Sequence, residues 1–202
     1  MASRITSARG TAWLIRAIAD DLFRWDAFTL DLYSAEDDKV TPFYNVDTDR
    51  SGKRYELDLS GAPREPSGMA RRVISNGAEL ILREPPLVMP ADVIAIGEEH
   101  RPSASLMVVP IRNRTQVIGI LSVQSYSFNA YDSHDLGTLQ TLADYCAGAL
   151  ERIRTEQALR ESEERFRTVF EAAQDGIYIK NRALRYTHVN HAMCTLLGRS
   201  PE

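Results

Sequence analysis

Cysteine is scarce in this chain, with only Cys146 and Cys194 among 202 residues, in unlike sequence contexts. A disulfide framework or a thiolate metal centre needs more cysteines at closer spacing, so we predict neither and expect a reducing, cytoplasmic location. Of the four histidines, only His100 and His134 precede residue 155, which is too few for a metal site. We therefore predict no metal and no cofactor, while an unknown small-molecule ligand stays open.

Long apolar runs and an excess of positive charge are also missing. No apolar stretch approaches the roughly 20 residues of a membrane-spanning helix, and residues 1–10 lack the apolar core of a signal peptide. The 24 Lys and Arg are outnumbered by 28 Asp and Glu, which gives a formal net charge of -4. We expect no membrane insertion in this fragment and no nucleic-acid partner, since no broad basic surface can form.

Signatures of catalysis are absent as well. The eleven glycines are scattered, so the chain has no Gly-rich loop that would hold a phosphate. Ser, His and Asp do not recur at a spacing that supports a catalytic triad. We predict that this fragment is not an enzyme.

Two apolar segments joined by a short polar turn, residues 105–112 and 116–124, form the clearest pattern that is present. Both carry apolar residues at odd and even positions, so we expect strands that are covered on both faces. In the second strand we place Ile118 with Ile120 on one face and Val117 on the other. An opening helix and a final helix are expected on one side of the sheet, and a short helix with a Pro-rich loop on the other.

The remaining elements follow from apolar periodicity and capping residues. A 3-4 spacing predicts a helix over residues 3–23, and Ser67 predicts the N-cap of a short helix over residues 68–75. In the irregular stretch 83–102, only residues 91–96 favour a helical turn. Further strands are expected at residues 27–33, 40–46, 55–59 and 79–82.

A very long helical pattern follows Asp132. Its apolar seam divides into two parts that do not join in register, because three residues are inserted around Glu156. Such an insertion locally overwinds a coiled coil, and we predict that this helix is one. The seam residues are Leu139, Leu142, Cys146, Ala149 and Ile153, and then Leu159, Ser162, Phe166, Val169 and Ala173.

After Gly176 the period changes to that of a hairpin, residues 177–179 and 186–189, followed by a helix at residues 192–197. A hairpin and one short helix cannot bury a core of their own. We expect this segment to be the start of a second, incomplete domain.

Six segments together resemble a GAF domain in their order and spacing: WDAFTLDLY (25–33), SGMARRVISNG (67–77), SLMVVPI (105–111), VIGILSVQS (117–125), YDSHDL (131–136) and ALER (149–152). Three more resemble the opening of a PAS domain: ESEERFR (161–167), FEAAQDGI (170–177) and VN (189–190). The resemblance implies an α+β fold with an antiparallel sheet of five or six strands and helices on both faces, then a long helix and a partial PAS hairpin. The implied domains are a sensory domain at 1–154, a signalling helix at 155–170 and the beginning of a PAS domain at 171–202.

The same resemblance implies a small-molecule pocket and dimerisation through the terminal helices. Arg72 is the residue we expect to meet an anionic ligand. The full set of predicted pocket residues is Tyr44, Met69, Arg72, Val73, Ile94, Met107 and Val109. The predicted homodimer interface contains Ile15, Leu22, Leu142, Ala149 and Ile153.

The cofactor-binding branches of the GAF family are disfavoured by missing residues. Bilin attachment and methionine sulfoxide reduction both need pocket cysteines, and no cysteine precedes Cys146. The Asn-Lys, Phe and Asp-Glu constellation of cyclic-nucleotide binders is also lacking. We predict a non-catalytic sensory and dimerisation module of a bacterial two-component signalling protein, of the sensor histidine kinase type, with PAS and output domains downstream. Three alternatives stay open. The whole protein is a cyclic-di-nucleotide enzyme, the GAF domain binds a cofactor or is enzymatic, or the fragment is a ligand-free spacer.

Overall fold

The computed structural model describes residues 8–58, 63–87 and 101–198, with the backbone alone at 8, 153, 154 and 157. The predicted pocket residue Ile94 and the predicted turn at residues 91–96 lie outside this range. The chain divides into two compact units, Met1–Ile153 and Arg154–Glu202, which are treated separately below.

The first unit is built on one six-stranded sheet in which every neighbouring pair is antiparallel. The strand order is β3-β2-β1-β6-β5-β4, so β1 and β6 lie in the middle and β3 and β4 at the edges. The α+β prediction with five or six antiparallel strands is confirmed. The strands are β1 (Ala27–Ser34), β2 (Lys39–Thr48), β3 (Arg54–Leu57), β4 (Glu79–Leu82), β5 (Ser105–Asn113) and β6 (Gln116–Ser125).

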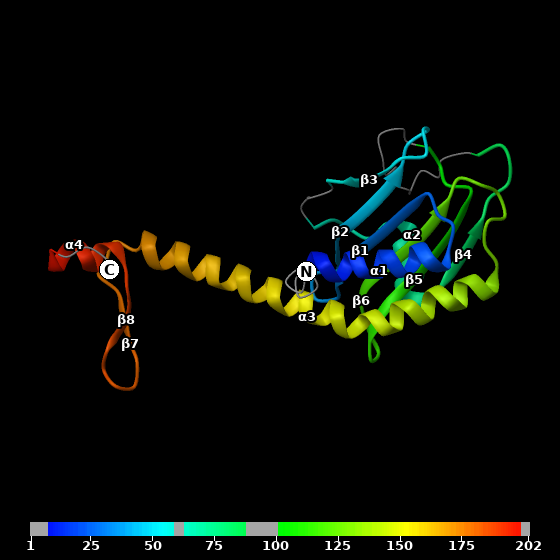
Figure 1. The fold of residues 1–202 in the computed structure, drawn as a ribbon. Helices are drawn as coiled ribbons and strands as arrows, with labels where there is room; N and C mark the ends of the chain where they lie inside the picture. Colours follow the sequence, from blue (N-terminus) through cyan, green and yellow to red (C-terminus); the bar gives the residue numbers. More distant parts are fainter. Residues whose placement is uncertain (1–7, 59–62, 88–100, 199–202) are drawn as a thin grey trace. The chain divides into compact units, whose positions relative to one another are not determined.

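Helices cover both faces of this sheet (Figure 1). Helix α1 (Ala8–Leu22) and the first part of α3 (Ser133–Ala172) pack against one face in a single apolar cluster that includes Phe28 and Leu121. Helix α2 (Gly68–Asn76) packs on the other face through Ala70 and Val73. This is the arrangement predicted for the three helices, because strands that are apolar on both sides need a cover on each.

The helix boundaries follow from capping side chains that the sequence displays. The Ser67 hydroxyl accepts a hydrogen bond from the Ala70 N–H at the start of α2, and Gly77 ends that helix with a φ of 102°. The Asp132 carboxylate accepts bonds from the N–H groups of His134 and Asp135 at the start of α3. These contacts satisfy amide groups that the first helical turn leaves without partners.

A β-bulge in β6 corrects one of our placements. Ile111 pairs with Gly119 and Arg112 with Val117, so Ile118 is an additional residue without a partner on β5. Because a bulge reverses the alternation of side chains, Ile118 joins the cluster beneath α1 and α3, while Val117 faces α2. Our placement of Ile118 on the same face as Ile120 is therefore wrong.

The second unit contains the rest of α3, the hairpin β7 (Tyr178–Lys180) and β8 (Tyr186–Val189), and helix α4 (His191–Leu197). The hairpin and the last helix confirm the elements expected after Gly176. Helix α3 is unbroken over 40 residues from Ser133 to Ala172. The predicted relay helix is thus helical throughout, including the position of the seam break at Glu156.

Candidate functional site

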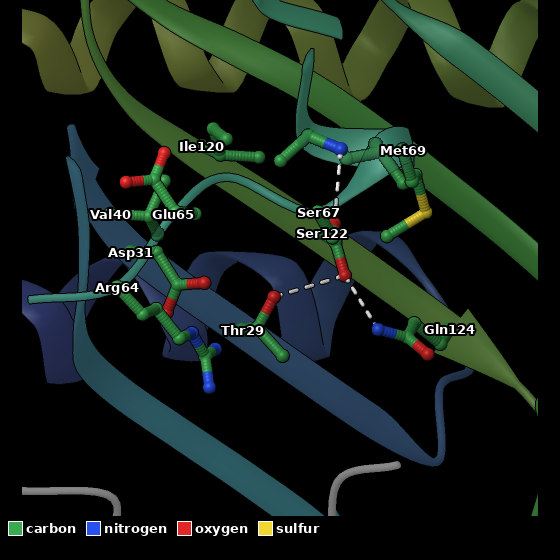
Figure 2. A pocket seen from close by; sticks show the side chains of 12 residues that line it. Thr29, Asp31, Val40, Arg64, Glu65, Ser67, Met69, Ile120, Ser122 and Gln124 are labelled. Atoms are coloured by element: carbon green, nitrogen blue, oxygen red, sulfur yellow. Dashed lines mark hydrogen bonds between the residues drawn. The ribbon is translucent and has the colours of Figure 1, made fainter. Parts of the chain in front are cut away.

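A cavity of about 70 Å³ lies between the sheet and the segment that leads into α2 (Figure 2). Strands β1 and β6 supply its polar floor, and α2 with the preceding loop supplies the rim. The volume exceeds several-fold the ~10–15 Å³ that one water molecule needs. The residues around it are Thr29, Asp31, Val40, Arg64, Glu65, Ser67, Met69, Ala70, Val108, Ile120, Ser122 and Gln124.

The floor of the cavity carries a hydrogen-bonded row of polar side chains. The Thr29 hydroxyl donates to Ser122 Oγ at 3.1 Å, and Gln124 Nε2 donates to the same oxygen at 2.8 Å (Figure 2). The Ser103 hydroxyl donates to Gln124 Oε1 at 2.8 Å. The row is therefore held in place by bonds within itself, which fixes its geometry before any ligand arrives.

Asp31 differs from this row because one of its carboxylate oxygens is buried without a partner. Asp31 Oδ1 and the neighbouring Asn45 Oδ1 are both shielded from solvent and neither accepts a hydrogen bond from the described residues. Burial raises the pKa of Asp31 to about 6, and the positive charge of Arg64 and the Asn45 side chain only partly oppose that effect. A buried, unsatisfied acceptor is costly, so Asp31 is the candidate ligand-binding residue of this cavity.

At the rim of the cavity, Glu65 is neutralised by basic side chains that do not line it. Glu65 is paired with Lys39 and, at 3.0 Å, with Arg71. Arg71 also bonds Asp38 at 2.8 Å, which holds the pKa of the Asp38 carboxyl below its usual range. Glu65 therefore adds little net charge to the cavity.

The predicted pocket residues do not come together in one place. Tyr44, Met107 and Val109 are buried on the opposite face of the sheet, in the cluster with α1 and α3. Their side chains fill the core of the first unit. Our assignment of these three to the same pocket as the α2 residues is corrected by the position of the two clusters.

The α2 residues lie on the expected face, but only Met69 lines the cavity. Val73 is fully buried in the smaller apolar cluster, where it packs α2 onto the sheet. Arg72 points away and bonds Glu79 at 3.1 Å. Whether Met69 binds a ligand stays a prediction.

The polar floor was missed, although the sequence carries a signal for it. Thr29 and Asp31 alternate with apolar residues in β1, and Ser122 and Gln124 occupy positions two apart in β6. Polar residues two apart share one face of a strand, and β1 pairs with β6 so that Thr29 lies opposite Ser122. Recognising the site needed this pairing, which no short-range pattern provides.

The predicted dimer residues are divided between core and surface. Ile15 and Leu142 are 2% and 7% exposed, because they pack inside the first unit. Leu22 is half exposed and Ala149 partly exposed, and the side chain of Ile153 lies outside the described residues. On α1 the side chains of Leu14 and Ile18 are exposed to solvent, whereas that of Ile15 is buried.

Two further features bound the chemistry of the described residues. Within residues 8–58, 63–87 and 101–198, no three His, Cys, Asp or Glu side chains are grouped so that they would hold a metal ion. Over the same residues, no helix combines the length and apolarity required to cross a bilayer.

Replacing Asp31 by Asn is expected to change how stability depends on pH. The folded parent keeps its Asp31 proton up to about pH 6, whereas the unfolded chain releases it near ~4, so the parent loses stability as the pH rises between these values. Asp31→Asn removes this loss and should gain on the order of 1–2 kcal/mol relative to the parent between pH 4 and pH 7. Urea denaturation at both pH values measures the difference.

The matched control is Asp37→Asn, at the exposed turn between β1 and β2. Its stability profile should run parallel to that of the parent from pH 4 to pH 7. A parallel profile for Asp31→Asn as well would contradict the raised pKa.

Comparison with known sequences identifies both parts of the chain. A sequence model of the GAF domain matches residues 7–151, and one of the PAS domain matches residues 164–202. A curated relative, the methyl sulfide methyltransferase-associated sensor of Methanosarcina acetivorans, is 34% identical over 89 residues. The matched part covers 43% of this chain but only 9% of that relative.

Solved structures show the same fold at low sequence identity. The GAF domain of a two-component sensor histidine kinase from Bacillus halodurans aligns with a TM-score of 0.54 at 17% identity, covering 75% of this chain and 99% of that one. The GAF domain of an Acinetobacter phosphoenolpyruvate-protein phosphotransferase gives 0.56 at 14%, covering 75% and 87%. A free methionine-R-sulfoxide reductase from Neisseria meningitidis gives 0.52 at 18%, covering 74% and 80%.

The fold of the first unit agrees with the sequence match. A GAF domain followed by a PAS segment, with a sensor among its relatives, has the composition of a signalling sensor module. Since the GAF model matches well over half of the residues, this chain belongs to the GAF domain family.

Proposed function

We propose that this chain is a non-catalytic sensory and dimerisation module of a bacterial signal-transduction protein of the sensor histidine kinase type, located in the cytoplasm. The observation that carries the proposal is helix α3. Its first part is packed into the core of the GAF domain through Leu139 and Leu150, and the same helix runs without a break to Ala172. We expect a change in that packing to be transmitted along the helix, because packed elements switch between discrete arrangements.

The exposed apolar residues support a homodimer. Leu14, Ile18 and Leu22 lie four residues apart on α1 and are 43%, 38% and 49% exposed. Side chains at this spacing share one helix face. A second copy of the chain would remove this stripe from water, at roughly 25 cal/mol for each Å² of apolar area.

The later part of α3 has its own apolar seam. Leu159, Phe166 and Val169 are 59%, 49% and 71% exposed and follow the spacing of a heptad repeat. Exposed residues at this spacing pair with a second helix in a coiled coil. The PAS segment also exposes apolar side chains that support a partner domain downstream, among them Leu184, Tyr186 and Leu196.

The cavity argues against a ligand-free spacer. A spacer gains nothing from a carboxylate with one buried oxygen that no described residue bonds, since an apolar residue at position 31 would cost less. An enzymatic role has no support from the described residues of the cavity, which offer no thiol.

Breaking the exposed stripes should convert a dimer into a monomer. We expect the parent to sediment as a dimer at micromolar concentration, and the triple variant Leu14→Glu, Ile18→Glu and Phe166→Glu to sediment as a monomer. The cause is burial of like charges in an apolar interface. Sedimentation velocity over a concentration series measures the effect.

Leu82→Glu is the matched control, because Leu82 is also 43% exposed but belongs to the edge strand β4 and not to α1 or α3. This variant should remain a dimer. A parent protein that stays monomeric throughout the micromolar range would refute the dimer and the relay that depends on it.

A further inference from the structure

The cavity on the α2 face contains two opposite charges that are not paired with each other. Asp31 projects from β1 and Arg64 from the loop before α2, and both line the cavity (Figure 2). No ion pair or hydrogen bond joins them in the described part of the chain, although the Arg64 charge is close enough to act on Asp31. A ligand with one charge of each sign would match both.

One carboxylate oxygen of Asp31 lacks a hydrogen-bond donor among the described residues. Among the described residues no donor reaches Asp31 Oδ1, which lines the cavity, or the oxygen Oδ1 of the neighbouring Asn45, which does not line it. The hydroxyl of Thr29 and the amide of Gln124 already donate hydrogen bonds to Ser122 Oγ. An ammonium group carries three donors and a positive charge, so it can donate to Asp31 Oδ1 and compensate the charge of the carboxylate.

Arg64, in the same cavity, matches an acceptor with negative charge. Arg64 presents a planar guanidinium, which binds a carboxylate in a bidentate manner. The remaining charged group of the cavity, Glu65, is held by Lys39 and Arg71. It therefore neither neutralises Arg64 nor competes for the ligand.

We propose that the cavity binds a small zwitterion of the α-amino acid class, with its ammonium group on Asp31 and its carboxylate on Arg64. The volume of about 70 Å³ and the apolar wall of Met69, Val108 and Ile120 select an amino acid with no side chain or with a single methyl group, which are glycine and alanine. The proposal rests on the proposed sensory function, for which it names the class of signal.

Isothermal titration calorimetry of the full 202-residue chain tests the proposal, with glycine and L-alanine as probes. We expect either amino acid to bind, and Asp31→Asn and Arg64→Gln each to weaken binding by about 10–100-fold, because each loses a charge-assisted hydrogen bond. Methylammonium chloride and sodium acetate, which each carry one half of the ligand, should bind at least about tenfold more weakly. Affinity should also rise as the pH increases through about 6, where Asp31 ionises.

Arg72→Gln and Asp37→Asn are the matched controls, since both residues lie outside the cavity, and neither should change the affinity. Far-ultraviolet circular dichroism and thermal unfolding identify any variant that fails to fold, and Arg64→Lys then replaces Arg64→Gln as a milder test. Three outcomes overturn the proposal: no binding of either amino acid at ~10 mM, unchanged binding in Asp31→Asn or Arg64→Gln, or equally tight binding of methylammonium or acetate.

The oligomeric state separates this proposal from the sensory one. A protein that is dimeric but binds no amino acid loses only the ligand assignment. A protein that binds glycine or alanine but sediments as a monomer keeps the ligand assignment and loses the relay.

Discussion

Gly119→Ala is expected to destabilise the GAF domain by about 1–3 kcal/mol, the range for overpacking of a core. A Cβ at this position would lie 2.7 Å from Leu150 Cδ2 and 2.8 Å from the backbone oxygen of Asp31. Leu150 is fully buried and the Asp31 oxygen belongs to the backbone of a central strand, so neither can move cheaply. Urea denaturation followed by circular dichroism measures the loss.

The same substitution also tests how α3 is seated on the sheet. Leu150 projects from α3 onto Gly119, beside the bulge at Ile118, so the methyl group would push helix and strand apart. Because Asp31 is the other neighbour, we expect the substitution to disturb the cavity floor as well as the helix.

Gly148→Ala is the matched control, because Gly148 lies in α3 two residues before Leu150. Nothing lies within 4 Å of a Cβ at Gly148, which is exposed to solvent. Alanine is favoured over glycine in a helix interior, so this variant should gain up to about 1 kcal/mol. Equal stability of Gly119→Ala and the parent would show that the close approach of α3 to β6 is wrong.

Asn190→Ala is expected to unfold the hairpin and α4 of the second unit, at a cost of about 2–3 kcal/mol. Asn190 is fully buried, and its side chain joins three elements. Its Oδ1 accepts bonds from the N–H groups of Ile177 at 2.8 Å and Met193 at 3.0 Å. Its Nδ2 donates to the carbonyl groups of Phe170 at 3.1 Å and Asp175 at 2.9 Å.

The physical reason for the large effect is that alanine leaves several backbone groups without partners at once. The end of α3, the entry to β7 and the first turn of α4 all depend on this one amide. The second unit has few buried apolar residues to compensate, with Phe170 and Cys194 the buried ones among its described side chains. Hydrogen exchange measured by mass spectrometry should show protection lost across residues 177–197.

Asn181→Ala provides the comparison at an exposed position in the same hairpin. Its Oδ1 accepts bonds from Ala183 and Arg185 within the turn, where water can replace them. We expect about 0.5–1 kcal/mol and little change in exchange outside the turn. Protection of residues 177–197 that survives in Asn190→Ala would contradict the role of Asn190 as the central contact.

Local patterns were enough for most of the elements of this chain. The Ser67 hydroxyl, the Asp132 carboxylate and Gly77 act on their own backbone within a few residues, so their effects are visible in the sequence. The apolar residues at both odd and even positions of β5 and β6 likewise showed that the sheet is covered twice. Each of these signals depends on contacts between near neighbours in the chain.

Assigning each side chain to one face of the sheet or the other required the tertiary structure. Alternation separates Met107 from Val108 but does not say which of them lies beneath α2, because both faces of the strand are apolar. The bulge at Ile118 then changed the alternation within β6. Because both faces of the sheet are apolar, Tyr44, Met107 and Val109 were assigned to a pocket on the face opposite to the one they occupy.

The sequence by itself determined the order of the elements, the long unbroken helix and the relation to GAF and PAS domains, because these depend on short-range periodicity and motif order. Only the tertiary structure decided where the site lies. Thr29 and Ser122 are 93 residues apart and meet through strand pairing, and Asp31 and Arg64 line one cavity between the sheet and the segment that leads into α2. Contacts over such separations arise from the packing of whole layers, which leaves no local pattern to predict them.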